Sequence, residues 1–149
     1  KLGVVQQIGA PQAVYDDPAN LFVAKFLGTP PINVFEGCVK GGRLFIGEDD
    51  VMAAPGVADQ AVFVGIRPEG FTPDENGALR CKLSNVEVMG RDSSVVSTHS
   101  ASANPVVRSI INSDIKVDTS CEEICFSLKP HKVFVFNKET EERIRFEVK

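Results

Sequence analysis

The sequence predicts a mainly β protein in which a short N-terminal helical segment precedes two small β-barrel lobes. Apolar residues recur at helical spacing within the first 30 residues and alternate at strand spacing from residue 32 onward. Glycine- and proline-rich turns separate the alternating runs. Many short strands joined by such turns are typical of barrels and sandwiches rather than of parallel sheets.

The first 30 residues contain one helix with a clear start and end. A strand is expected near Leu2–Ile8 and a brief helical turn at 12–15. Asp17 and Pro18 then supply an N-cap and a proline that fits the first helical turn. Gly28 ends the helix, and the prolines that follow prevent it from resuming. The apolar face of this helix is formed by Phe22, Val23, Phe26 and Leu27.

Strands are expected throughout the rest of the chain. They are Ile32–Lys40, Arg43–Ile46, Ala61–Ile66, Leu79–Met89, Ser93–Thr98, Val106–Ile111, Glu122–Leu128, Lys132–Phe136 and Arg143–Val148. The pair Gly41 and Gly42 predicts a tight hairpin. A one-residue slip in the alternation predicts a bulge near Ser84 and Asn85. The strand pattern runs twice, with a Pro/Gly-rich break at 67–77, which favours two small intertwined lobes.

Composition excludes several classes of protein. The chain has 149 residues, 43% of them hydrophobic and 24% charged, which is typical of a globular protein and not of a disordered one. Apolar runs such as 21–24 fall far short of the roughly 20 residues that span a bilayer. The net charge of −4 argues against binding to nucleic acid phosphates. Because the chain opens without Met, we expect it to be part of a longer protein.

Residues that often carry chemistry are scattered. The four cysteines are Cys38, Cys81, Cys121 and Cys125, and without a CxxC pair they predict free, partly buried thiols in a reducing compartment. A zinc site that combines them with His99 or His131 matches no common ligand spacing. We expect both histidines to lie at the surface without a partner, and the acidic run 48–50 to be a solvated turn rather than a calcium site.

No catalytic signature is visible in this chain. It has no GxxxxGK[ST] phosphate loop, no GxSxG, no HExxH and no EF-hand loop, so we predict that it is not an enzyme by itself. The most distinctive stretch ends a predicted strand at Val64–Glu69. Pro68 holds Arg67 in an extended conformation, and the side chains of Arg67 and Glu69 flank it. A structural clamp is favoured there over a ligand contact.

Two segments resemble motifs of one known family. The first lies within residues 3–33 and includes Gln7, Gly9, Pro11, Tyr15, Pro18, Phe22, Val23, Ala24, Phe26 and Gly28. The second consists of Gly65, Ile66, Arg67, Pro68 and Glu69. Both are similar to motifs that follow the nucleotide-binding domain in ATP-binding subunits of ABC transporters of the maltose and multiple-sugar type. Weaker similarities at Val86–Gly90 and from Phe136 to Ile144 extend the resemblance over essentially the whole chain.

The resemblance implies a division of the chain. Residues 1–30 would be the end of the nucleotide-binding domain and a helical linker. Residues 31–149 would be a regulatory region of two intertwined OB-like lobes, the transport-associated OB (TOBE) domain. ATP and Mg would be bound in the parent protein upstream of Lys1, so no cofactor, metal ligand or catalytic residue is expected here. The residues of the two motifs would have structural or regulatory roles.

The resemblance also implies a function. It is regulation and dimerisation of the ATP-binding subunit of an importer, for carbohydrate. One alternative is the same domain in a polyamine, ferric-ion or oxyanion importer, and another is a free-standing OB-fold module that binds nucleic acid. The implied partners are a second copy of the chain, membrane permease subunits reached through the ATPase domain, and a regulatory protein, without nucleic acid. The implied location is cytoplasmic, at the inner face of the cell membrane.

Overall fold

The computed structural model describes residues 18, 20–26, 32–112, 115, 120, 122–144 and 146. The strand expected at 2–8 and the turn at 12–15 lie outside these residues, as do Gln7, Gly9, Pro11, Tyr15 and Gly28 of the linker motif. Within the described part of the chain, no helix has the length and hydropathy of a membrane span.

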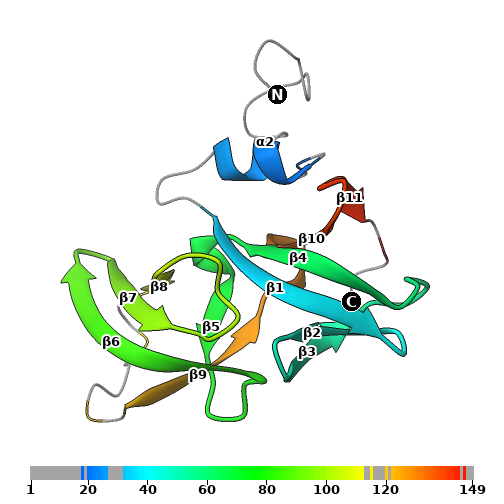
Figure 1. Ribbon diagram of the computed structural model, residues 1–149. Coiled ribbons are helices and arrows are strands. Elements are labelled where there is room, and N and C mark those ends of the chain that lie inside the picture. The colour runs from blue at the N-terminus through cyan, green and yellow to red at the C-terminus, as the bar shows by residue number, and fades with distance from the viewer. Residues whose placement is uncertain are drawn as a thin grey trace.

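The described strands form two antiparallel sheets (Figure 1). The first sheet contains, in spatial order, β11 (Arg143–Ile144), β10 (Val133–Asn137), β4 (Gln60–Ile66), β1 (Asn33–Lys40), β2 (Arg43–Ile46) and β3 (Asp49–Ala53). The second contains β5 (Phe71–Pro73), β9 (Glu123–Leu128), β6 (Leu79–Met89), β7 (Asp92–Thr98) and β8 (Val107–Asn112). β5 also contacts β8 at the opposite edge, so the second sheet curls into a nearly closed barrel. The mainly β, barrel-like fold predicted from the sequence is confirmed.

The predicted elements agree closely with the observed ones. Helix α2 spans Leu21–Phe26, inside the predicted helix, although the side chains of its Phe22, Val23 and Phe26 are outside the described set. All nine predicted strands are present, most of them with ends shifted by a residue or two. The last one is described as a strand only at β11.

Two short strands, β3 and β5, were not predicted. β3 begins with two aspartates, and β5 has only three residues and ends in Pro73, so neither carries a clear apolar alternation. Both lie at sheet edges, where short or proline-containing strands are tolerated. Their positions are therefore set by the neighbouring strand rather than by their own pattern.

Two local predictions about the strands are confirmed. Gly41 and Gly42 join β1 to β2 and have φ values of 60° and 75°, the left-handed conformation that a two-residue hairpin turn requires. The pairing of β6 with β7 shifts register between Leu83 and Asn85, which places the bulge where the alternation slips.

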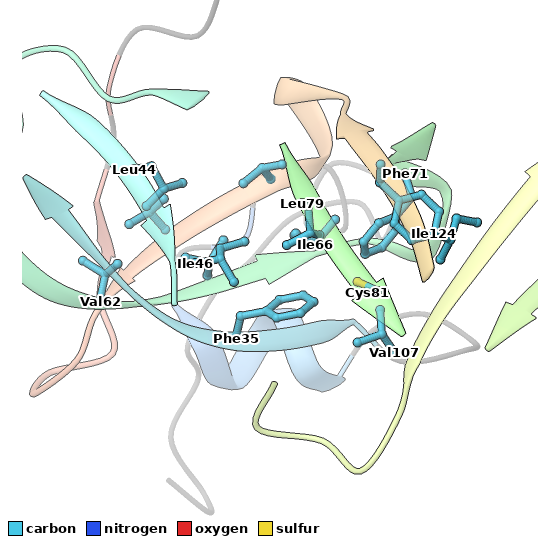
Figure 2. Packing of buried hydrophobic residues seen from close by; sticks show 14 of the residues in the cluster. Phe35, Leu44, Ile46, Val62, Ile66, Phe71, Leu79, Cys81, Val107 and Ile124 are labelled. Carbon is cyan, nitrogen blue, oxygen red and sulfur yellow. The ribbon is translucent and has the colours of Figure 1, made fainter. Parts of the chain in front are cut away.

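One hydrophobic core is shared by both sheets (Figure 2). Phe35 and Ile66 of the first sheet and Leu79 and Phe126 of the second belong to the same cluster of buried residues. The chain also returns from the second sheet to the first, because β10 follows β9 in sequence and pairs with β4. The two sheets therefore depend on each other for burial.

A second, smaller cluster fixes the helix. Leu21 and Ala24 of α2 are buried against residues just before and at the start of β1 and against residues of β10, namely Ile32, Val34, Phe134 and Phe136. Six residues make less than two turns, too short for a helix that is stable in isolation. We conclude that packing on the first sheet holds α2 in place.

Candidate functional site: an arginine joint and a polar cleft

Arg67 lies at the point where β4 ends, before the 3-10 turn η1 (Pro68–Gly70). Its backbone is extended, with φ −62° and ψ 147°, as a residue before proline requires. The side chain is fully buried, and Nη1 donates a hydrogen bond of 3.0 Å to the carbonyl oxygen of Ala24. The backbone N–H of Arg67 donates to the carbonyl of Lys132 at 3.1 Å. One residue therefore links α2, β4 and the turn before β10.

A second arginine approaches the same helix from the C-terminal strands. Arg143 of β11 donates from Nη1 to the carbonyl oxygen of Pro18 at 2.9 Å. The guanidinium carbons of Arg67 and Arg143 lie 5.6 Å and 4.6 Å from the centre of the Phe134 ring, within the range of cation–π contacts. We call these three side chains the arginine joint.

Backbone contacts reinforce the arginine joint. Leu21 donates its N–H to the carbonyl of Glu141 at 3.0 Å, and Asn20 forms an isolated β-bridge with Glu142. Glu141 has a positive φ of 63°, which is uncommon for a residue other than glycine. The turn between β10 and β11 thus contacts the start of α2 directly.

The remaining residues of the Gly65–Glu69 motif flank Arg67 in the chain. A Cβ at Gly65 would lie 2.8 Å from Cδ1 of Ile32 and 3.2 Å from Cε2 of Phe136, so these side chains would have to shift to admit it. Pro68 is buried, and Glu69 Oε2 lies 3.5 Å from Nζ of Lys132. Of the linker motif, the structure brings Pro18 and Ala24 to the joint. No sequence pattern connects Arg143 and Phe134 with the arginine joint, because only the fold brings these two residues to it.

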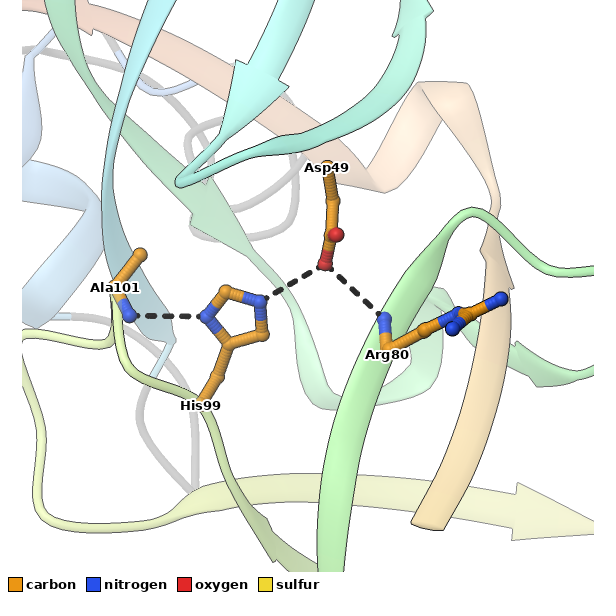
Figure 3. Close-up of polar contacts among 4 residues, drawn as sticks. All are labelled: Asp49, Arg80, His99 and Ala101. Carbon is orange, nitrogen blue, oxygen red and sulfur yellow. Dashed lines mark hydrogen bonds and ion pairs between the residues drawn. The ribbon is translucent and has the colours of Figure 1, made fainter.

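A polar contact connects the two sheets at another place (Figure 3). His99 Nε2 lies 3.1 Å from Oδ2 of Asp49, and the same oxygen accepts the backbone N–H of Arg80 at 3.2 Å. The backbone N–H of Ala101 donates to Nδ1 of His99 at 3.0 Å. Because Nδ1 accepts, the ring proton belongs on Nε2, which donates to Asp49. Asp49 belongs to β3 of the first sheet, whereas Arg80 belongs to β6 of the second.

The prediction that His99 is a partnerless surface residue is wrong. Its side chain is only 6% exposed, and its ring meets the ring of Phe35 edge-on at 5.7 Å. The prediction that 48–50 is a solvated turn holds for Glu48, which lies exposed in a turn, but it is wrong for Asp49 and Asp50, which begin β3, where Asp50 pairs with Arg43 at 2.9 Å. Asp49 and His99 are fifty residues apart, so no local pattern could have joined them. His131, in contrast, is exposed as predicted.

A cleft opens beside the Asp49–His99 contact. Its volume is about 790 Å³. Its lining consists of charged, hydroxyl-bearing and small residues, namely Gly47, Glu48, Asp49, Arg80, Cys81, Lys82, Thr98, His99, Ser100, Glu122 and Glu123. We call it the intersheet cleft. Among the described residues, no group of three or more His, Cys, Asp or Glu side chains is arranged to hold a metal ion.

Three of the four cysteines are described, and all three are free thiols, as predicted. Cys81 is buried, while Cys38 and Cys125 are half-buried. Cys121 lies outside the described residues. Burial raises the pKa of the Cys81 thiol from 9.0 to about 12, because the thiolate would lose its hydration.

This burial predicts a difference in thiol reactivity. At about pH 8, iodoacetamide should alkylate Cys38 and Cys125 of the folded chain well before Cys81, because the thiolate is the reacting species. Peptide mass spectrometry measures the three rates, and urea should make them equal. Between pH 9 and about 12, the Cys81 thiol keeps its proton in the folded chain and loses it in the unfolded chain. The contribution of Cys81 to the free energy of unfolding therefore falls as the pH rises above 9. Equal rates in the folded chain would contradict the assigned burial.

Comparison with known proteins shows which proteins are similar in sequence to this chain. No family model matches the chain. The sn-glycerol-3-phosphate import ATP-binding protein of Jannaschia sp. (strain CCS1) is 31% identical over 144 residues, which is 95% of this chain and 40% of that protein. This chain is homologous to the C-terminal part of ABC transporter ATP-binding proteins.

Other ABC transporter ATP-binding proteins show the same similarity. The sn-glycerol-3-phosphate import ATP-binding protein of Ruegeria pomeroyi is 37% identical over 91 residues, 61% of this chain and 26% of that protein. A putative ABC transporter ATP-binding protein of Mycoplasma genitalium is 35% identical over 145 residues, 95% of this chain and 24% of that protein. The chain thus spans well under half the length of the relatives that it matches.

Proposed function

We propose that this chain is the regulatory and dimerisation region of the ATP-binding subunit of an ABC importer. The observation that carries the proposal is the similarity of 95% of the chain to the C-terminal part of a named import ATP-binding protein. In this role, residues 1–30 complete the nucleotide-binding domain and its linker, and residues 31–149 form the regulatory region. ATP and Mg belong to the parent protein, which contacts membrane permease subunits at the cytoplasmic face of the membrane.

The arginine joint supports this role mechanically. A regulatory region influences an ATPase domain only if the connection between them transmits motion. Arg67 and Arg143 hold carbonyls of Ala24 and Pro18, while Leu21 and Ala24 are packed on the first sheet. The described end of the linker is therefore held against the first sheet at several points. In our proposal it moves together with that sheet as one rigid unit.

The imported solute is proposed to be a carbohydrate. Two of the relatives reported above are named for the import of sn-glycerol-3-phosphate, and the sequence motifs resemble those of the sugar type. A polyamine, ferric-ion or oxyanion importer remains the alternative in the same class. A free-standing nucleic-acid binder is disfavoured by the net charge of −4.

Light scattering of the 149-residue chain tests dimerisation, and titration with a fluorescent ATP analogue tests the assignment of the region. We expect a particle of twice the 16.1 kDa chain mass at high concentration, formed through a two-fold symmetric surface, without nucleotide binding. A single-chain mass at every concentration would refute the dimerisation role. Saturable ATP binding would refute the assignment to a region outside the nucleotide site.

A further inference from the structure

The outer face of the first sheet is only partly covered by α2. Side chains of β1 alternate between the two faces, so that Phe35 and Val39 belong to the core shared by both sheets, whereas Val34 belongs to the cluster that holds α2. The helix and the second sheet therefore lie on different sides of β1, as Figure 1 shows. The cluster that holds α2 includes residues of β1, β4 and β10 but no described residue of β2.

An apolar strip continues along this face beyond the helix. Phe63 of β4 packs partly against the α2 cluster, and Ala61 follows it two residues earlier on the same strand. Cys38 of β1 pairs with Ala61 on one side and with Phe45 of β2 on the other. Phe63, Cys38 and Phe45 are half-buried, and Ala61 is exposed. We call these four residues the outer strip.

Two ion pairs flank the outer strip. Nζ of Lys138 lies 3.1 Å from Oε1 of Glu36 and 5.8 Å from the centre of the Phe63 ring. At the other end, Nη2 of Arg43 lies 2.9 Å from Oδ1 of Asp50. Because each pair neutralises itself, this rim has no excess charge that would attract nucleic acid or an anionic membrane surface. An apolar centre with a polar rim is typical of a surface that contacts another protein domain.

The size of the outer strip favours a partner that is already attached to it. Neighbouring strands lie about 4.8 Å apart, so a strip across β4, β1 and β2 is only about 10 Å wide. Stable association with a free protein takes about 800 Å² on each partner. A domain of the same chain needs less, because the covalent link replaces association from solution by a contact at high effective concentration.

The position of α2 indicates which domain this is. Helix α2 is the first element that the structure describes, and it lies on the same face as the outer strip. The matched relatives are longer proteins, and this chain corresponds to their C-terminal part, for example to 40% of the Jannaschia protein. In a parent protein of that kind, the preceding domain would be connected through α2 to the face that carries the outer strip.

We propose that the outer strip is the docking surface for the ATP-binding domain of the parent protein. The proposal rests on the proposed function, because it requires such a domain before α2. The two domains then meet twice on one face of the first sheet, through the chain at α2 and through packing at the outer strip. A movement of the ATP-binding domain would act on β1, β2 and β4 directly.

The thiol of Cys38 reports whether the outer strip is covered. Iodoacetamide is applied at about pH 8 to the 149-residue chain and to the full-length parent protein, and peptide mass spectrometry measures the alkylation rate of Cys38 in each. We expect alkylation at least about tenfold slower in the parent protein, because a thiol beneath a docked domain is out of reach of the reagent. Cys125 is the internal control, since it is also half-buried but lies on β9 of the second sheet, and its rate should be the same in both proteins.

A substitution within the outer strip tests the contact itself. Phe45→Ser removes an aromatic ring from the strip, so the rate of Cys38 in the parent protein should rise toward that of the 149-residue chain. Val96→Ser is the matched control, because Val96 is half-buried on β7 of the second sheet, and it should leave Cys38 protected. Thermal melts verify that both variants fold, and the comparison of the two unsubstituted proteins does not depend on them.

Three other results would each overturn the proposal. The first is an equal rate for Cys38 in the two proteins, or a slowing that Cys125 shares. The second is protection of Cys38 that a folded Phe45→Ser variant leaves intact. The third is a Cys38 rate that falls as the concentration of the 149-residue chain rises, since the outer strip would then pair with a second copy. The light-scattering mass and the nucleotide titration are measured separately, so failure here is distinguishable from failure of the proposed function.

Discussion

Replacement of Arg67 by alanine is expected to lower the free energy of unfolding by about 3–5 kcal/mol and to release α2 from the first sheet. The side chain is fully buried, so truncation leaves a cavity. It also removes the donor to the Ala24 carbonyl and one of the two guanidinium groups on the Phe134 ring. An unsatisfied buried carbonyl alone costs about 1–3 kcal/mol.

Urea denaturation measures the loss of stability, and hydrogen exchange of the amides at 20–26 measures the release of the helix. Arg91→Ala is the matched control, because Arg91 is exposed in the turn between β6 and β7, and its effect should stay within about 0.5 kcal/mol. Arg67→Lys keeps the charge but loses the planar fork, so we expect an intermediate loss. If Arg67→Ala behaves like Arg91→Ala, the arginine joint does not hold the helix.

Under the proposed function, this result bears on how the regulatory region would communicate with an ATPase domain. A flexible linker would pass on little of a structural change in the β-structure. The contacts of Leu21 with Glu141 and of Arg143 with Pro18 connect the linker to the last strands of the chain. The beginning and the end of the described chain therefore meet at one point. That point is where we expect a regulatory signal to pass.

The sequence predicted the strands well because alternation is a local property. Leu44 and Ile46 of β2 are buried on either side of half-buried Phe45, as their spacing indicated. Both the bulge at Leu83/Asn85 and the glycine turn at 41–42 also follow from neighbouring residues. β3 and β5 escaped prediction because only their pairing with another strand defines them.

The candidate sites were harder to predict because they are built from distant residues. Arg67 was recognised from its motif, but Phe134 and Arg143 carry no signal that connects them with it. His99 looked isolated in the sequence, although Asp49 faces it across the two sheets. Pairings between residues fifty or more positions apart depend on sheet topology, and local periodicity contains no information about it.

The largest core effect is expected at Phe35, where Phe35→Ala should lower the free energy of unfolding by about 3–5 kcal/mol. The ring is fully buried on β1, belongs to the core shared by both sheets, and contacts the ring of His99. Its loss should therefore also loosen the contact between His99 and Asp49. Phe35→Leu, a milder change, should cost only about 1 kcal/mol and keeps the test useful if the alanine variant does not fold.

The same variants test whether the chain unfolds as one cooperative unit or as two separate lobes. Because both sheets bury residues in one cluster, Phe35→Leu should shift a single urea transition seen alike by circular dichroism and by the NMR signal of His99. Phe45→Ala is the control, since Phe45 is half-buried on β2 outside this cluster and should cost far less. Two separate transitions would mean that the lobes fold independently. A signal received in one sheet would then have no route through the core to the other.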